Sequence, residues 1–268
     1  MSITASGAQS TETPVGAVAA PVRRLANWLT SVHHATIGAS LLVGAAVWLL
    51  VASAVGAVLG VDRLDAGSAT VSADALTQLF SLHRYALVFG VAAPAMLGVV
   101  VWSLPSQLHA ANLSLPRLAA FGWWSWLVGS VVVLASYLGN GGPGGGDAQY
   151  VETYLLGLGI VLLALVLIAV SIAATVMTRR NGQRLGDVPV SAFAGLVTAI
   201  GVTLTLPVAL GTLVYVWLDF VNARVAFGGT DLIDSWLGWV TREPHTLLVV
   251  VPALGGLADR SEEDTSEL

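Results

Sequence analysis

Five long apolar runs constrain the fold of this chain more than any other feature of its sequence. Each run has about 20 or more mostly apolar residues, which as a helix is long enough to cross a hydrocarbon core of about 30 Å. Inside lipid the backbone N–H and C=O groups must bond to each other, so such runs predict helices. The predicted spans are residues 35–60, 78–102, 118–138, 153–178 and 190–218.

The composition supports an all-α membrane protein. The chain is 56% hydrophobic and 10% charged, whereas soluble domains have about 25% charged residues. A sixth apolar run, 246–258, is too short to span, so we expect a polytopic bundle of five to six transmembrane helices. The absence of cysteine excludes disulfides and thiolate metal sites. The net charge of −5 comes mostly from loops and the tail, and it indicates no nucleic-acid partner.

The two ends of the chain differ from its middle. Residues 1–30 begin with a run of Ser, Thr, Ala, Pro and Gly, and we expect a disordered cytosolic tail. Residues 31–259 form the predicted transmembrane domain. The segment "RSEEDTSEL", residues 260–268, is polar and acidic and follows an unfinished apolar run. We interpret it as the translation of a sequencing adapter, and the domain as truncated. The other interpretation is a short acidic cytosolic tail.

Arginine placement predicts the orientation in the membrane. Cytoplasmic segments of membrane proteins carry an excess of basic residues close to the spans. With the N-terminus inside, the inner segments hold six arginines and the outer loops hold three. The pattern therefore predicts a cytoplasmic N-terminus, in a prokaryotic plasma membrane. The inner residues are Arg23, Arg24, Arg117, Arg179, Arg180 and Arg184, and the outer ones are Arg63, Arg224 and Arg242.

Two polar residues, His83 and Arg84, lie near the start of the second run, in "LFSLHRYALVFG". A neutral imidazole at this depth can hydrogen-bond to a neighbouring helix or bind a metal such as haem iron. Spacing alone favours the hydrogen bond. Arg84 is near enough to the interface for its side chain to reach water, and it can also pair with an anionic group.

The residues around His83 resemble subunit I of the haem-copper oxidases, the cytochrome c oxidase family. The resemblance runs from "QLFSLHRYALVFGVAAPAMLG" through "WSLPSQLHAANLSLPRLAAFGWWSWLVGSVVVLAS". "HHATIGASLL" is similar to the opening of the family, and "LTLPVALGTLVYVWLDF" is similar to its fifth helix. In order, the resemblance covers roughly residues 30–258. The matched positions include Gln78, His83, Phe89, Pro94, Gly98, Pro105, Pro116, Arg117, Trp123 and Ser136.

The resemblance implies a role for each of the two polar residues. His83 matches an axial ligand of the low-spin haem of the family, and Arg84 becomes a candidate contact for a haem propionate. The second axial ligand belongs to a later helix of a fold with about twelve helices. The implied activity is that of an oxidoreductase in aerobic respiration, which couples electron transfer through haem to oxygen reduction and proton translocation. The implied partners are other oxidase subunits, the lipid bilayer and a donor such as a cytochrome c or a quinol.

Several positions depart from the family pattern. The sixth helix of the family opens with His-Pro-Glu-Val-Tyr, in which the histidine binds copper. Here the aligned segment is "EPHTL", so Glu243 occupies the copper-ligand position and no copper ligand is assigned. Asn112 replaces an aspartate of the proton channel, and Arg63 lies two residues from a position where a basic residue is expected near the haem. The alternative interpretation is therefore a catalytically degenerate oxidase-fold subunit that binds one haem or acts structurally in a respiratory complex.

Overall fold

The structure is a computed structural model that describes residues 22–24, 26–64, 71–145, 147–224, 226, 232–242 and 246–266. The chain divides into two units, Met1–Ser31 and Val32–Leu268. In the first unit, residues 22–24 and 26–29 are helical, and Thr30 donates from its N–H and its hydroxyl to the Ala26 carbonyl. Residues 1–21 lie outside the described part, so the predicted disorder of the tail stays a prediction.

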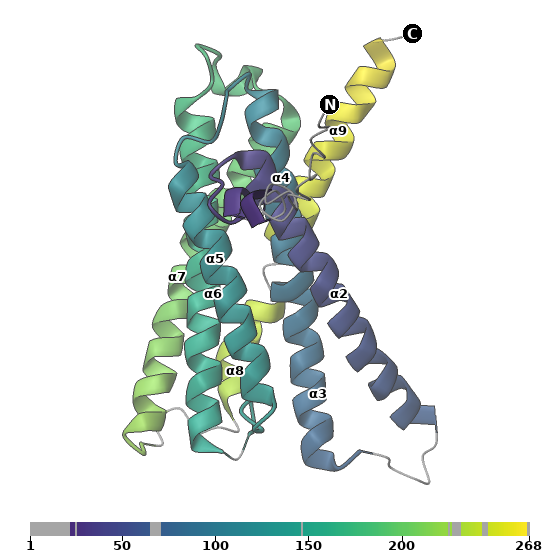
Figure 1. Cartoon of the computed structure of the whole chain (residues 1–268), viewed down its shortest axis with the longest axis vertical. Coiled ribbons are helices and arrows are strands. Elements are labelled where there is room, and N and C mark those ends of the chain that lie inside the picture. Colours follow the sequence, from purple (N-terminus) through teal and green to yellow (C-terminus); the bar gives the residue numbers. More distant parts are fainter. Residues whose placement is uncertain are drawn as a thin grey trace, which may run out of the picture. The chain divides into compact units, whose positions relative to one another are not determined.

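The second unit is a bundle of helices that run up and down (Figure 1). Five helical stretches are long and apolar enough to cross a membrane, and they overlap the five predicted spans. No strand occurs in the described ranges, which confirms the predicted all-α membrane fold. The elements are α2 (His34–Leu64), α3 (Ala73–Tyr85), η1 (Ala86–Ala92), α4 (Ala93–Gln107), α5 (Pro116–Tyr137), α6 (Ala148–Thr178), η2 (Leu185–Asp187), α7 (Val190–Val221), α8 (Ile233–Arg242), η4 (Thr246–Val250) and α9 (Val251–Ser266).

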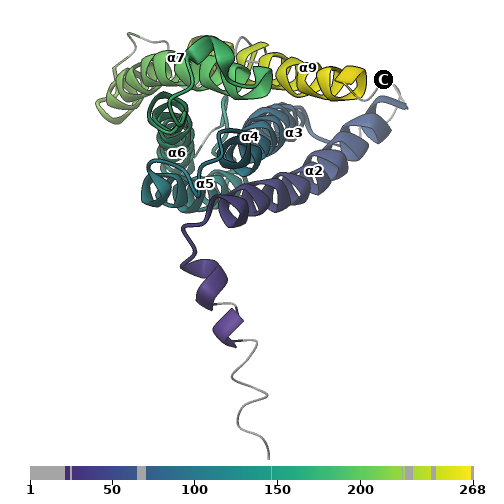
Figure 2. The same cartoon turned by 90° about the horizontal axis from the view of Figure 1, so that it is seen from above.

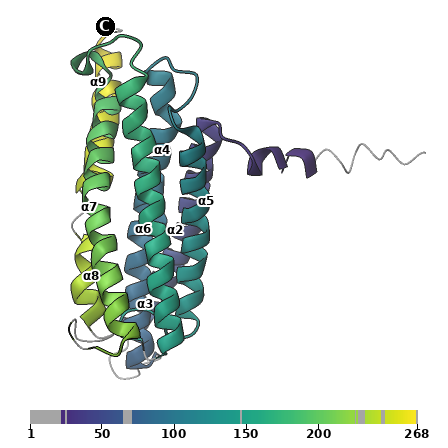
Figure 3. The same cartoon turned by 90° about the vertical axis from the view of Figure 1, so that its left-hand side faces the viewer.

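Neighbours in the bundle are mostly neighbours in the chain. Helix α6 runs between α5 and α7 (Figure 3), and these are two of its principal contacts. Helix α4 lies between α2 and the α7–α9 pair (Figure 2). The sixth apolar run forms η4 and the start of α9, and α9 continues to Ser266, through most of the polar segment 260–268.

Helix α2 crosses α4 at two glycines. A Cβ atom at Gly38 would lie 2.8 Å from the Gly98 carbonyl oxygen, and one at Gly98 would lie 3.1 Å from the Gly38 carbonyl oxygen. The two backbones can approach this closely because neither residue has a side chain at the crossing. Association of helices in lipid depends on such small residues, since there is no hydrophobic driving force between them. Beyond the crossing, the α2 face continues through buried Leu41, Ala45 and Trp48.

The Gly-rich loop between α5 and α6 is tied to α3. The Gln78 side chain accepts from the Gly142 N–H at 2.8 Å and donates to the Pro143 carbonyl at 3.1 Å. Gly141, Gly142 and Pro143 are buried, and a Cβ at Gly142 would lie 2.3 Å from the Tyr137 ring. Glycine is therefore required for the close packing, and the loop closes the end of the bundle from which α3 starts.

Candidate functional site

The structure places His83 on α3 with its ring turned toward α2. The Nδ1 atom lies 3.0 Å from the Ala52 carbonyl oxygen. A carbonyl can only accept, so the hydrogen bond requires the proton to be on Nδ1 and leaves a lone pair on Nε2. Histidines that bind metals commonly donate their other ring N–H to a backbone carbonyl, which fixes the tautomer and the orientation of the ring. The structure therefore shows the hydrogen bond to a neighbouring helix that spacing alone favours, and this bond leaves Nε2 with a lone pair that can ligate iron.

Gly56 on α2 makes room for the His83 ring. A Cβ atom added at Gly56 would lie 3.1 Å from Cε1 of His83, 3.6 Å from Nδ1 and 3.9 Å from Nε2. The imidazole thus lies over a position without a side chain, one turn along α2 from Ala52. No signal in the sequence identifies Gly56 or Ala52 as part of the site, because the contact depends on how α2 and α3 are rotated against each other.

A second face of α3 is fixed to α5 by polar contacts. The Ser81 hydroxyl lies 2.8 Å from the Tyr137 hydroxyl, and the Tyr85 hydroxyl lies 3.2 Å from that of Ser130. Residues 81 and 85 are one helical turn apart, so both point to the same neighbour. Tyr85 and Ser130 are fully enclosed, with exposed fractions of 2% and 0%. These bonds fix the rotation of α3 and therefore the direction in which His83 points.

The chain changes from an α-helix to a π-helix directly after Tyr85. Element η1 continues to Ala92, and the Ala93 N–H donates to the Val88 carbonyl, five residues back. In this register the next donor, at position 94, would serve the Phe89 carbonyl, but Pro94 has no N–H. The Trp126 Nε1 on α5 donates to that carbonyl instead, at 2.9 Å. Short π-helical segments occur frequently at functional sites, and Pro94 is the one sequence signal that could have indicated this one.

Arg84 faces a different side of α3 from His83. Successive residues of a helix are about 100° apart. Arg84 lines a cavity of about 540 Å³ together with Asp74, Thr77 and Pro143. It also borders a small cavity of about 20 Å³ near Tyr154. The structure therefore does not bring His83 and Arg84 together on one face.

Arg63 lies on the same side of α3 as His83. Its guanidinium carbon stands 5.4 Å from the centre of the Phe80 ring. Phe80 precedes His83 by three residues and so lies on the same helical face. Arg63 follows Gly56 by two turns of α2. A second arginine thus borders the α2–α3 contact, close to where the family pattern predicts a basic residue.

Asn112 acts as a clamp between the α4–α5 loop and the start of α2. Its Oδ1 accepts from the His34 N–H at 3.0 Å and from the Leu113 N–H at 2.9 Å. Its Nδ2 donates to the Val32 carbonyl at 3.1 Å. Both functions of the amide are therefore used in hydrogen bonds to backbone groups. An aspartate could not make the Val32 bond, because a carboxylate has no donor.

The position of Glu243, where the family pattern predicts a copper ligand, lies outside the described residues, as does His245, the histidine of the aligned segment "EPHTL". Within the described ranges no group of three or more His, Asp or Glu side chains could hold a metal ion. In the part of the chain that the structure describes, the candidate metal chemistry therefore rests on His83 as a single ligand.

The chain is similar in sequence to known respiratory oxidases. The family profile described as "Cytochrome C and Quinol oxidase polypeptide I" matches residues 36–259. Quinol oxidase subunit 1 of Bacillus subtilis is 22% identical over 246 residues, which cover 85% of this chain and 38% of the relative. The heme-copper oxidase subunit I+III of Aeropyrum pernix is 27% identical over 254 residues, covering 87% and 31%. Cytochrome c oxidase subunit 1 of Bacillus subtilis is 24% identical over 247 residues, covering 85% and 39%. The chain spans between three tenths and four tenths of the length of these relatives.

Proposed function

Because the chain belongs to the cytochrome c and quinol oxidase polypeptide I family, we propose that it is part of subunit I of a haem-copper respiratory terminal oxidase and that His83 is an axial ligand of its low-spin haem. The observation that carries this proposal is the hydrogen bond from Nδ1 to the Ala52 carbonyl. It leaves Nε2 available for iron. Gly56 supports the assignment, because a side chain at that position would press on the ring.

In this proposal the residues around His83 orient its ring and hold the helix that carries it. When bound, a haem supplies one-electron chemistry through its iron. Ala52 orients the imidazole of His83, and the bonds of Ser81 and Tyr85 to α5 keep α3 from rotating. The Trp126 bond holds the π-helical segment that follows.

We assign Arg84 and Arg63 to the anionic groups of the haem. Arg84 is adjacent to His83 in the chain but faces another side of α3, where it lines the cavity of about 540 Å³ together with Asp74, so a propionate there would need Arg84 to offset that carboxylate. Arg63 borders the α2–α3 contact on the side of His83. Removal of either positive charge is expected to lower the midpoint potential of the haem, because the oxidised iron carries one more positive charge than the reduced iron. The arginine that contacts a propionate will give the larger decrease.

The proposed setting is a prokaryotic plasma membrane with a cytoplasmic N-terminus. Successive helices alternate in direction, so Arg117, Arg179, Arg180 and Arg184 gather at one end of the bundle. The excess of arginine supports assigning this end to the cytoplasm. His83 is then closer to the outer surface, where a cytochrome c or quinol donor would deliver electrons. The complete subunit I and the other oxidase subunits would supply the remaining haem ligands and the path for proton translocation.

Two observations favour a second candidate function, that of an oxidase-fold subunit that carries electrons or acts structurally without reducing oxygen. Glu243 stands where the family has a copper ligand. Asn112, at the aligned proton-channel position, is occupied in holding α2. Neither position therefore has the residue type that, in the family, binds copper or carries protons.

The test is a reduced-minus-oxidised absorption spectrum of the full-length subunit assembled with its partners, with and without carbon monoxide. We expect a low-spin haem band that His83→Ala abolishes, because the iron loses an axial ligand. His109→Asn is the matched control, since His109 lies at the other end of the bundle and its positive φ of 51° suits asparagine.

The response to carbon monoxide separates the two candidate functions, and the His83→Ala spectrum tests the ligand. A band that shifts with carbon monoxide supports the terminal oxidase, and a band without a shift supports the electron-carrying subunit. A low-spin band that persists in His83→Ala would refute the assignment of His83 as a ligand.

A further inference from the structure

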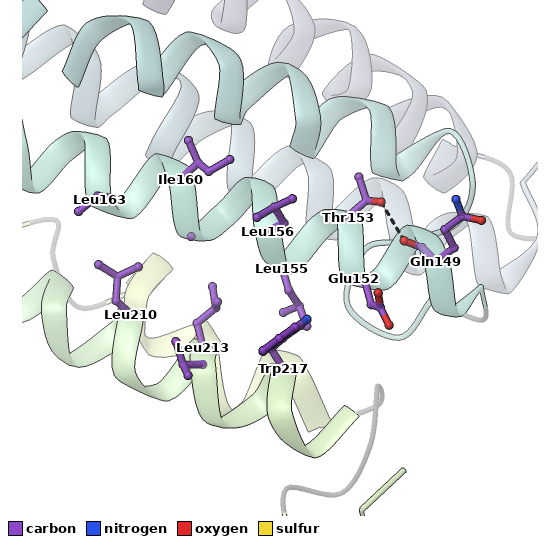
Figure 4. Close-up of a pocket in the computed structure, with 12 residues that line it drawn as sticks. Gln149, Glu152, Thr153, Leu155, Leu156, Ile160, Leu163, Leu210, Leu213 and Trp217 are labelled. Carbon is purple, nitrogen blue, oxygen red and sulfur yellow. Dashed lines mark hydrogen bonds between the residues drawn. The ribbon is translucent and has the colours of Figure 1, made fainter. Parts of the chain in front are cut away.

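An apolar groove runs between α6 and α7 and has polar side chains at one end only (Figure 4). Its volume is about 600 Å³. Leucine side chains from both helices lie along it, and Glu152, Gln149 and Thr153 gather at the end where α6 begins. Trp217 of α7 lies near that same end (Figure 4). The groove therefore has an amphipathic arrangement along its length.

The groove is open because α6 has a glycine where α7 approaches it. A Cβ at Gly159 would meet one atom, Cδ2 of Leu213, at the ordinary contact distance of 3.6 Å. The side chains at the rim are exposed, Leu156 by 61% and Val214 by 49%. Lipid tails are as apolar as leucine, so these side chains can pack against an acyl chain. In the described part of the chain the groove is open at its rim.

The length of the groove corresponds to one leaflet of a bilayer. From Gln149 to Leu163 the lining of α6 extends over about 21 Å at 1.5 Å per residue. A bilayer with its polar regions is about 40–45 Å thick, so one leaflet is about 20–22 Å. Gln149 and Glu152 then lie at the level of lipid headgroups, and Leu163 lies near the midplane. A transmembrane helix of a partner would need a groove about twice as long.

The charge at the polar end of the groove favours one class of lipid headgroup over another. Glu152 is the one acidic residue among the described residues that line the groove, and none of those residues is basic. A carboxylate at this level attracts an ammonium group and repels an anionic headgroup. We propose that this groove binds one phospholipid with an ethanolamine headgroup, its ammonium beside Glu152 and an acyl chain along the leucines. Trp217 is placed as tryptophans at membrane interfaces commonly are.

The experiment is native mass spectrometry of the 268-residue chain, released from nanodiscs that contain equal amounts of phosphatidylethanolamine and phosphatidylglycerol. We expect one retained phospholipid per chain, with phosphatidylethanolamine preferred about threefold, as for a single exposed charge pair. The mass identifies the occupant directly. A quinone, a second copy of the chain or an anionic lipid in its place would refute the proposal.

Two variants assign the bound lipid to the groove. Gly159→Phe fills the groove and is expected to reduce retention at least fivefold for both lipids, whereas Gly211→Phe, at an open position of α7 outside the groove, leaves retention unchanged. Glu152→Gln is expected to remove the preference without loss of binding. Asp187→Asn makes the same change of charge at the other end of the bundle and keeps the preference.

The proposal fails if Gly159→Phe and Gly211→Phe retain lipid equally, because the lipid would then lie elsewhere. It also fails if the preference persists in Glu152→Gln. Helical circular dichroism of each variant verifies that the bundle has formed.

Discussion

The α5–α6 interface and the α2–α3 contact both depend on glycine, but their glycines face different neighbours. A Cβ at Gly157 would lie 2.8 Å from the backbone nitrogen of Val133, and one at Gly129 would lie 3.0 Å from the Gly157 carbonyl oxygen. A Cβ at Gly56, in contrast, would meet the ring of His83. Between α5 and α6 the glycine admits another backbone, whereas between α2 and α3 it admits a side chain.

The α5–α6 interface therefore belongs to the scaffold of the bundle, whereas the α2–α3 contact surrounds the side chain of His83. A backbone atom in a helix can move only if the helix moves, so the α5–α6 interface does not adapt to a larger residue. An imidazole ring can shift by a few tenths of an ångström without moving its helix. The α2–α3 contact is therefore the place where a small change in packing can alter the position of a functional atom and leave the fold intact.

The largest expected effect is that of Gly157→Leu. The added side chain would collide with the α5 backbone, and we expect the free energy of unfolding to fall by about 3 kcal/mol. At Gly159, two residues along the same helix, a Cβ would meet only Cδ2 of Leu213, at the ordinary contact distance of 3.6 Å, so Gly159→Leu should change the free energy of unfolding by no more than about 0.5 kcal/mol. Titration with SDS in mixed micelles, followed by circular dichroism, measures both values. Equal losses in the two variants would contradict the scaffold role of α5–α6.

Trp126→Phe tests the hydrogen bond that links α5 to η1, the π-helical segment that follows α3. It removes the donor to the buried Phe89 carbonyl, and an unsatisfied buried acceptor costs about 2 kcal/mol. Trp102→Phe is the control, because Trp102 is 54% exposed and should contribute within about 0.5 kcal/mol. The same titration provides the measurement. If the two substitutions prove equivalent, the Trp126 bond does not hold the π-helical segment.

Gly56→Ala tests the α2–α3 contact, in which the glycine leaves room for the His83 ring. The methyl group would displace the His83 ring slightly, with a loss of about 1 kcal/mol in the free energy of unfolding. Gly60→Ala, at an open position of the same helix, should instead stabilise the chain by about 0.5 kcal/mol, since alanine loses less conformational entropy in a helix. In the assembled subunit, Gly56→Ala should also shift the low-spin haem band. Opposite signs of the two changes would support the packing of His83 on Gly56, and equal gains would exclude it.

The smallest effect is expected for Asn112→Asp. The carboxylate still accepts from the His34 N–H and is favourable at the start of a helix, but it loses the bond to the Val32 carbonyl. We therefore expect a loss of about 0.5 kcal/mol in the same titration. Faster hydrogen exchange confined to residues near Val32 would locate the lost bond. A loss as large as that of Trp126→Phe would mean that the amide donor, rather than the acceptor, fixes the start of α2.

The sequence predicts the five spans because length and apolar content are local properties of a segment. It also indicates His83 and Arg84, since polar side chains are rare in such runs. It does not separate Trp126, which is fully buried, from Trp102, which is exposed, although both lie in apolar helices. Nor does it indicate that Asn112 bonds to the backbone of residues 32 and 34.

The sequence by itself determined that the described part of the chain forms five helices long and apolar enough to cross a membrane, because lipid leaves the backbone no other way to satisfy its hydrogen bonds. Only the tertiary structure decided which atoms of those helices meet. His83 and Ala52 are 31 residues apart, and their bond depends on the rotation and crossing of α2 and α3. That rotation is set jointly by the glycines of α2 and by the bonds from Ser81 and Tyr85 to α5. No single segment contains this information.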